Sequence, residues 1–250
     1  MSDNWGLYCA DMAGHTAFIL FDDGISDEVD DLPQSFGLKI RVKLKDPRPD
    51  GLTTNEEAPT LNELEDRIKE RVGDRGGILL GRVTTNSIRW ILGLVHSPDV
   101  EPDIRGVLDA AGYTADIFIS PDPKKSVYWD DLYPDVESRR VLKDMLVLEQ
   151  LAEHGDDQDI VRRVDHWSYF GSKSTAQLFR DRLESDGYSI AAFEKLGPPL
   201  KREWLVHSHN ECSMRLSDIT RHTLRHLRSA IHYGGRYDGW ETRVERNEEA

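Results

Sequence analysis

Histidines are the residues of this chain whose spacing comes nearest to a metal site. Six of the nine histidines lie after residue 159, and His222 and His226 are four residues apart on a predicted helix. His207 and His209 are two residues apart, which places both on one face of a predicted strand. Four such side chains could bind zinc, so one alternative function is a metal-dependent hydrolase. Against it, no His-Glu-x-x-His motif supplies a general base, and His222 and His226 flank the polar side of their helix.

Motifs for nucleophilic catalysis and phosphate binding are absent from the sequence. It contains no Gly-x-Ser-x-Gly, no Gly-x-x-x-x-Gly-Lys and no Gly-x-Gly-x-x-Gly. Cys212 follows Glu211 and lies near His209, but a buried structural cysteine is the simpler interpretation. The aromatic and basic run of an RNA-recognition motif is also missing. The sequence therefore predicts a protein that is not an enzyme and needs no cofactor or metal.

The segment with the clearest binding character is Gly-Gly-Arg-Tyr-Asp-Gly-Trp-Glu-Thr at 234–242. Asp238 and Gly239 form a turn signal, and Tyr237 and Trp240 flank it with the ring types that are enriched at binding hot spots. These four residues are candidate partner-binding residues. The alternative is that both rings close the end of a small core, because aromatic side chains contribute heavily to burial.

A basic helix face is the second candidate surface. Arg221, Arg225, Arg228 and His232 fall together on the helical wheel, opposite the apolar stripe. These arginines could contact a partner or a phosphate backbone, so an RNA-binding module is a further alternative. An ordinary solvated face is the simpler interpretation.

The elements that must position these residues follow one order twice. Residues 35–120 read as strand, helix, strand, strand, helix, strand, and residues 164–242 repeat that order. Two short strands precede the first repeat, at Trp5–Ala10 and Thr16–Phe21, and a helix from about Asp135 to His154 joins the two repeats. The fold class is therefore α+β, with two ferredoxin-like (βαββαβ) sandwiches that contain antiparallel sheets.

Local signals fix several boundaries. Thr60 and Glu63 form a capping box that predicts the start of the first helix, and Ser172 or Ser174 caps the helix of the second repeat. Asn86 marks a hairpin, and Gly197-Pro-Pro marks the turn between two strands of the second repeat.

Charge and cysteine content limit the partners and the compartment. The net charge is −14, and residues 1–158 carry −15 of it against +1 for residues 159–250. A chain this acidic repels nucleic acid at long range and favours a basic protein partner. Two distant cysteines predict neither a disulfide framework nor a zinc ribbon, which favours a cytoplasmic protein, and no apolar run is long enough to span a membrane.

These residues resemble a known family. The 234–242 segment, preceded by a helix and by Glu-Cys-Ser-Met-Arg-Leu at 211–216, is similar to the end of the regulator of ribonuclease E activity B family. The helix from Asp135, Gly155-Asp-Asp and Asp165-His-Trp extend this resemblance over about residues 135–246. Residues 1–134 resemble the family called domain of unknown function 695, through Gly81-Arg-Val-Thr, Trp129 and Leu132-Tyr-Pro.

The resemblance implies two domains, 1–134 and 135–250, and a cytoplasmic, non-enzymatic protein that binds ribonuclease E and inhibits RNA degradation. An acidic protein suits a partner with an arginine-rich region, because opposite charges attract. The sequence departs from the family in one feature. A long acidic C-terminal tail is replaced by Glu245, Glu248 and Glu249 with interspersed arginines, so the acidic residues lie mainly in the N-terminal half.

Overall fold

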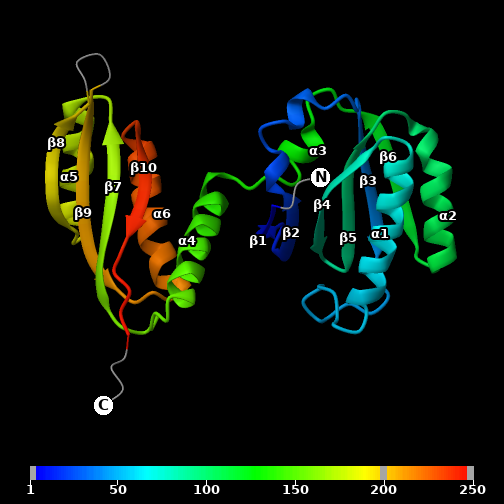
Figure 1. The fold of residues 1–250 in the computed structure, drawn as a ribbon, viewed down its shortest axis with the longest axis horizontal. Coiled ribbons are helices and arrows are strands. Elements are labelled where there is room, and N and C mark those ends of the chain that lie inside the picture. Colours follow the sequence, from blue (N-terminus) through cyan, green and yellow to red (C-terminus); the bar gives the residue numbers. More distant parts are fainter. Residues whose placement is uncertain (1–3, 198–201, 247–250) are drawn as a thin grey trace. The chain divides into compact units, whose positions relative to one another are not determined.

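The computed structural model describes residues 4–197 and 202–246, and the chain divides into two compact units. Unit 1 comprises Met1–Ser138 and unit 2 comprises Arg139–Ala250. Each unit contains one antiparallel sheet with helices packed on it, so the chain is α+β as predicted (Figure 1).

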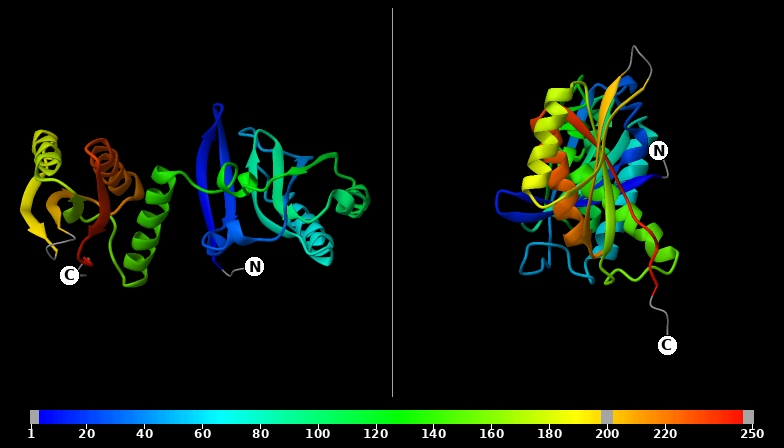
Figure 2. Two further views of the ribbon diagram at one scale, coloured as in Figure 1. Left: turned by 90° about the horizontal axis from the view of Figure 1, so that it is seen from above. Right: turned by 90° about the vertical axis from the view of Figure 1, so that its left-hand side faces the viewer.

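The strands of unit 1 form a six-stranded sheet in the order β1-β2-β4-β5-β3-β6, and every neighbouring pair is antiparallel. The two predicted early strands are confirmed: they form a hairpin at one edge of the sheet, beside β4 (Figure 2). Along the chain the elements are β1 (Trp5–Met12), β2 (His15–Asp22), β3 (Phe36–Lys43), α1 (Ala58–Asp74), β4 (Ile78–Thr85), β5 (Ile88–Val95), α2 (Glu101–Ala111), β6 (Ala115–Pro121) and α3 (Ser126–Trp129). Short 3-10 helices lie at Asp23–Ile25, Val29–Asp31 and Pro98–Val100.

The core of unit 1 follows from the alternation of β3. Leu38, Ile40 and Val42 are fully buried, whereas the intervening basic side chains are at most half-buried. The buried stripes of α1 and α2 pack on these residues in one apolar cluster. The hairpin turn at Asn86 is also confirmed, since Asn86 and Ser87 both have positive φ, as a two-residue turn between twisted strands requires.

The capping-box prediction at Thr60 is wrong. Helix α1 begins at Ala58, with Glu57 at the N-cap and Pro59 in the first turn. The Glu57 side chain makes no capping bond to the helix. It accepts hydrogen bonds from the backbone amides of Lys45 (2.7 Å) and Asp46 (3.0 Å) and so anchors the loop that precedes the helix. Pro59 favours the observed start instead, because the fixed φ of proline suits the first turn of a helix.

Unit 2 contains a four-stranded antiparallel sheet in the order β10-β7-β9-β8. Helices α5 and α6 cover one face of this sheet, and α4 packs beside α6 (Figure 1). The elements are α4 (Val136–Glu153), β7 (Arg162–Phe170), α5 (Lys173–Ser185), β8 (Ser189–Leu196), β9 (Glu203–Cys212), α6 (Leu216–His232) and β10 (Gly235–Glu241).

Two local predictions in unit 2 can be compared with the structure. Ser172 caps α5, because its hydroxyl accepts the Thr175 amide at 3.2 Å. Of the predicted turn at 197–199, Pro198 and Pro199 lie outside the described residues. Among the described residues, no helix combines the length and the apolar character that crossing a membrane requires.

Candidate functional site

The rings of Tyr237 and Trp240 lie inside unit 2. A β-bulge between Tyr237 and Gly239 shifts the register of β10, so that both rings point to the helix-covered face of the sheet. The Tyr237 hydroxyl lies 2.8 Å from His166 Nδ1, and Trp240 Nε1 donates to Asp144 Oδ1 at 2.8 Å. The sequence left two alternatives for these rings, an exposed binding site or a place in the core, and in the structure both rings lie in the core. They are not available as an exposed hot spot, whereas Asp238 is exposed and Gly239 is half-buried.

Asp144 of α4 is the centre of this arrangement. Its carboxylate is fully buried and accepts hydrogen bonds from Arg140 Nε at 2.9 Å, from Trp240 and from the Thr223 hydroxyl of α6. Burial raises the pKa of Asp144, while Arg140 and the other donors oppose that rise. One carboxylate thus ties α4, α6 and β10 together. The 234–242 segment therefore helps to hold α4 in place, through the hydrogen bond between Trp240 and Asp144.

A pair of stacked histidines fills the space between the sheet and α6. The rings of His166 and His226 lie 4.1 Å apart and nearly parallel, and both side chains are fully buried. Each has fixed partners: Asn210 lies 2.8 Å from His166 Nε2, and Ser208 lies 2.9 Å from His226 Nε2. Burial lowers the pKa of His226 to about 4, and burial together with His226 holds the pKa of His166 well below its usual range. Both rings are therefore neutral at pH 7.

The four histidines considered for a metal site do not converge. Ser208 faces α6, so the neighbouring His207 and His209 point to the opposite face of the sheet. His207 stacks on Trp167 at 4.8 Å and lies 2.7 Å from Asp165, whereas His222 and His226 belong to α6. The hypothesis of one zinc site built from these residues is therefore wrong. The described part of the chain holds no group of three or more His, Cys, Asp or Glu side chains placed to bind a metal ion.

Cys212 is placed as its simpler interpretation predicts, whereas the exposure of the basic face of α6 fits a solvated face and a binding face equally. Cys212 is buried, and burial raises the pKa of its thiol. Arg221, Arg225 and Arg228 are exposed on one side of α6, where Arg221 pairs with Asp218 and Arg225 lies 4.0 Å from Asp186. The structure brings these three arginines together but does not join them to Tyr237 and Trp240, which lie in the core.

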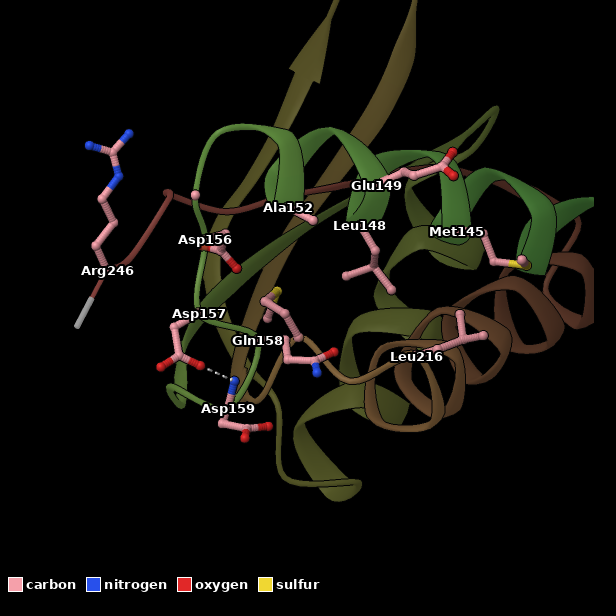
Figure 3. Close-up of a pocket in the computed structure, with 12 residues that line it drawn as sticks. Met145, Leu148, Glu149, Ala152, Asp156, Asp157, Gln158, Asp159, Leu216 and Arg246 are labelled. Atoms are coloured by element: carbon pink, nitrogen blue, oxygen red, sulfur yellow. Dashed lines mark hydrogen bonds between the residues drawn. The ribbon is translucent and has the colours of Figure 1, made fainter.

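A groove on unit 2 is a concave surface that the sequence patterns did not locate. It has a volume of about 1040 Å³ and lies between α4, the loop 155–159 and the start of α6 (Figure 3). Apolar side chains line it from both helices, among them Met145, which is 43% exposed, and Leu216, which is 38% exposed. The apolar lining consists of Met145, Leu148, Ala152, Met214 and Leu216. We call this surface the α4–α6 groove.

Carboxylates surround the α4–α6 groove. Its polar lining includes Glu149, Asp156, Asp157 and Asp159 against one arginine, Arg246. Asp156 pairs with Arg162 and Asp159 with Arg215, which fixes the loop, and Met214 N donates to the Gln158 carbonyl at 2.8 Å. The groove is thus a partly apolar surface with an acidic rim, and ion pairs and a backbone hydrogen bond fix the loop that borders it. The Gly155-Asp-Asp run, which belongs to the family resemblance, lies in the loop of this groove, but nothing in the run predicted a groove.

Comparison with known proteins gives two family matches. Residues 3–133 match the sequence model described as Family of unknown function (DUF695), and residues 143–242 match that of Regulator of ribonuclease activity B. The second match includes most of the α4–α6 groove and the Tyr237–Trp240 segment. Among curated proteins, no sequence matches.

Solved structures offer only distant similarity. A crystal structure of an unknown protein from Galdieria sulphuraria aligns with 84% of this chain and 99% of its own, at 12% identity and a TM-score of 0.26. A protein assigned provisionally as a glycine cleavage system transcriptional repressor aligns with 85% of this chain and 100% of its own, at 7% identity and a TM-score of 0.27.

Proposed function

This chain belongs to the family of unknown function DUF695 through residues 3–133, and we propose, from the match of its second unit, that it is a non-catalytic regulator of RNA decay. Unit 2 is of the ribonuclease-regulator type, because residues 143–242 match that family. The proposal is that it binds ribonuclease E, or a similarly basic partner, and inhibits RNA degradation. The family match of residues 143–242 is the observation that carries this function.

The α4–α6 groove is the proposed docking surface. Its apolar lining offers area for burial, and the exposed Met145 can adapt to a partner's side chains, whereas Met214 is buried in the core of unit 2. Its rim carries four carboxylates and Arg246, but Asp156 is buried against Arg162 and Asp159 pairs with Arg215. Glu149 and Asp157 therefore supply the acidic character that favours a partner segment with apolar and basic side chains. A second copy of unit 2 would bring the same acidic rim and be repelled. The remaining candidate contact residues from the sequence are Asp238, Gly239, Arg221, Arg225 and Arg228.

Three of the histidines that could take part in acid–base chemistry have hydrogen-bond partners in the structure. His166 and His226 are buried against Tyr237 and Ser208, and His207 is held by Asp165. These bonds support a structural role for each histidine and, with it, the proposal that the protein acts by binding. A cytoplasmic location belongs to the same proposal. It is supported by the free thiols of Cys9 and Cys212, which are typical of a reducing compartment.

The ferredoxin-like fold is proposed for both units. In each unit a βαββαβ order along the chain accompanies a sheet in which the first and third strands of that order are central. In unit 1 the hairpin β1–β2 extends this arrangement by two strands.

The proposed function can be tested by measuring cleavage of a labelled RNA by purified ribonuclease E with and without the full chain. We expect the cleavage rate to fall as the chain is added. Met145→Lys and Leu216→Lys place positive charges in the groove, where they disrupt the apolar contact and repel a basic partner, and should weaken inhibition about tenfold or more. Leu178→Lys on α5 is the matched control, because Leu178 is 55% exposed and lies outside the groove. Unchanged cleavage with wild-type protein would rule out the proposed function. Equal effects of all three variants would rule out the groove alone.

A further inference from the structure

β1 is an outer strand of unit 1 whose free edge is regular and unprotected. It pairs with β2 over eight residues, from Trp5 with Asp22 to Met12 with His15, without a bulge. In the described chain no strand lies on its other side (Figure 2). Such an edge exposes a row of backbone N–H and C=O groups that another strand can pair with.

Two of the other three outer strands have bulges that interrupt the edge. The third, β6, is regular, carries one charge at Asp116 and ends at Pro121. β8 has a bulge between Ile190 and Ala192, and β10 has a bulge between Tyr237 and Gly239 and carries several charged side chains. Charges, prolines and bulges all hinder strand pairing. β1, with the sequence Trp-Gly-Leu-Tyr-Cys-Ala-Asp-Met, has only one charge, Asp11, next to its turn.

One face of the β1–β2 hairpin is also apolar and exposed. Leu7 and Cys9 share this face by alternation, and their partners across the hairpin are Leu20 and Phe18. Leu7 is 50% exposed and Phe18 is 39% exposed, and Cys9 is exposed as well. A partner strand on the free edge of β1 would extend the sheet and bury part of this face.

We propose that β1 pairs antiparallel with β1 of a second copy, so that two six-stranded sheets join across a twofold axis. The two sheets keep their faces only if odd-numbered residues lie opposite odd-numbered ones, which centres the pairing on Tyr8 or Cys9. Asp11 then lies opposite Trp5 or Leu7, so no like charges oppose each other in the strand pair. A basic strand would find a single carboxylate on β1. The charge pattern therefore favours a second copy over a cationic partner.

Salt dependence separates this contact from the proposed docking of a basic partner. Each chain carries a net charge of −14, so two copies repel at long range. Added salt screens that repulsion and leaves the apolar strand contact intact. Self-association should therefore strengthen with salt, whereas binding of a basic partner should weaken.

The test combines sedimentation with thiol cross-linking of the full chain. Analytical ultracentrifugation should show a dimer whose population rises with protein and salt concentration. In either centred register the two Cys9 Cβ atoms lie about 5–8 Å apart, within reach of a short bismaleimide. Cys212 is buried, so a covalent dimer should form and be lost in Cys9→Ser. A protein that stays monomeric and uncross-linked at high salt would overturn the proposal.

A matched pair of variants locates the contact. Leu7→Glu should weaken self-association about tenfold or more, because it puts a carboxylate at the joined edge in both copies, directly opposite Asp11 when the pairing is centred on Cys9. Phe118→Glu is the control, since Phe118 is also 50% exposed and lies on β6, the opposite edge of the same sheet. Equal weakening by the two variants would contradict pairing through β1. The cross-link in the wild-type protein remains informative if Leu7→Glu does not fold.

Discussion

Units 1 and 2 repeat one order of elements but fill their interiors differently. The main core of unit 1 is aliphatic apart from Tyr113, and helices α1 and α2 contact the sheet through leucine, isoleucine and valine. In unit 2 the space between the sheet and helices α4 and α6 holds His166, His226, Thr223 and Asp144, all fully buried. A polar interior demands specific partners, whereas an aliphatic one tolerates repacking. Unit 2 therefore depends on particular residues to hold α4, and α4 supplies one wall of the groove.

The two units also differ in net charge. Unit 1 carries −13 of the net charge of −14, and unit 2 is nearly neutral overall. The carboxylates of unit 2 can attract a basic partner because they gather at the α4–α6 groove, since the unit as a whole has little net charge. Changes that leave unit 1 intact should therefore reveal how far unit 2 relies on its buried polar residues.

The largest expected effect is that of Asp144→Ala. The substitution leaves the buried guanidinium of Arg140 without its carboxylate, which should lower the free energy of unfolding of unit 2 by about 3–5 kcal/mol. Asp116→Ala in unit 1 is the matched control, because Asp116 also pairs with an arginine but is exposed, and its loss should cost less than about 1 kcal/mol. Urea unfolding measures both. A loss of less than about 1 kcal/mol in the free energy of unfolding for Asp144→Ala would contradict the claim that Asp144 holds α4 in place.

Acid should destabilise unit 2 selectively. Unfolded His226 binds a proton near pH 6.5 and folded His226 only near pH 4, so the unfolded state is favoured as the pH falls through this window. The loss amounts to roughly 3 kcal/mol by pH 4, and the lowered pKa of His166 acts in the same direction. The raised pKa of Asp144 opposes it at the acid end of the window. Hydrogen exchange followed by mass spectrometry resolves the two units by peptide. Equal loss of protection in both units would contradict the prediction.

A smaller effect is expected for Trp240→Phe. The substitution keeps an aromatic ring, although a smaller one, and removes the indole N–H bond to Asp144, which should cost about 1–2 kcal/mol. Trp129→Phe in unit 1 removes the same kind of bond, from Trp129 Nε1 to Asp30 at 2.8 Å, but at an exposed position. Thermal melts of the two variants should therefore differ, with Trp240→Phe the less stable.

The smallest effect is expected on the exposed side of α6. Reversing Arg221, Arg225 and Arg228 to glutamate should change the stability of unit 2 by no more than about 0.5 kcal/mol per site. Filter retention of labelled RNA tests the RNA-binding alternative at the same time. We expect no retention by wild-type protein, and retention that disappears in the variant would establish the alternative.

Elements were predictable from the sequence where local patterns decide the structure. The alternation at 38–44 and the hairpin at Asn86 depend on nearest neighbours in the chain, and both are confirmed. The start of α1 was not predictable from Thr60, because the competing Pro59 and the tertiary bonds of Glu57 decide it.

The candidate site was less predictable, because it depends on which faces meet in space. The bulge in β10 turns Tyr237 and Trp240 inward. Asp238 and Gly239 mark its position in the sequence, but a turn signal does not say which way the flanking rings point. His207 and His222 were candidate ligands of one zinc ion, but they lie on opposite sides of the sheet. The α4–α6 groove combines residues about 70 positions apart, Met145 and Leu216, so only the fold could show it.

The central claim is that unit 2 acts by binding a basic ribonuclease partner. Calorimetric titration of the full chain into ribonuclease E at low and raised salt tests it most directly. We predict saturable binding that weakens as salt rises, because opposite charges contribute to the contact. Absence of binding at low salt, or binding that salt does not change, would contradict the account.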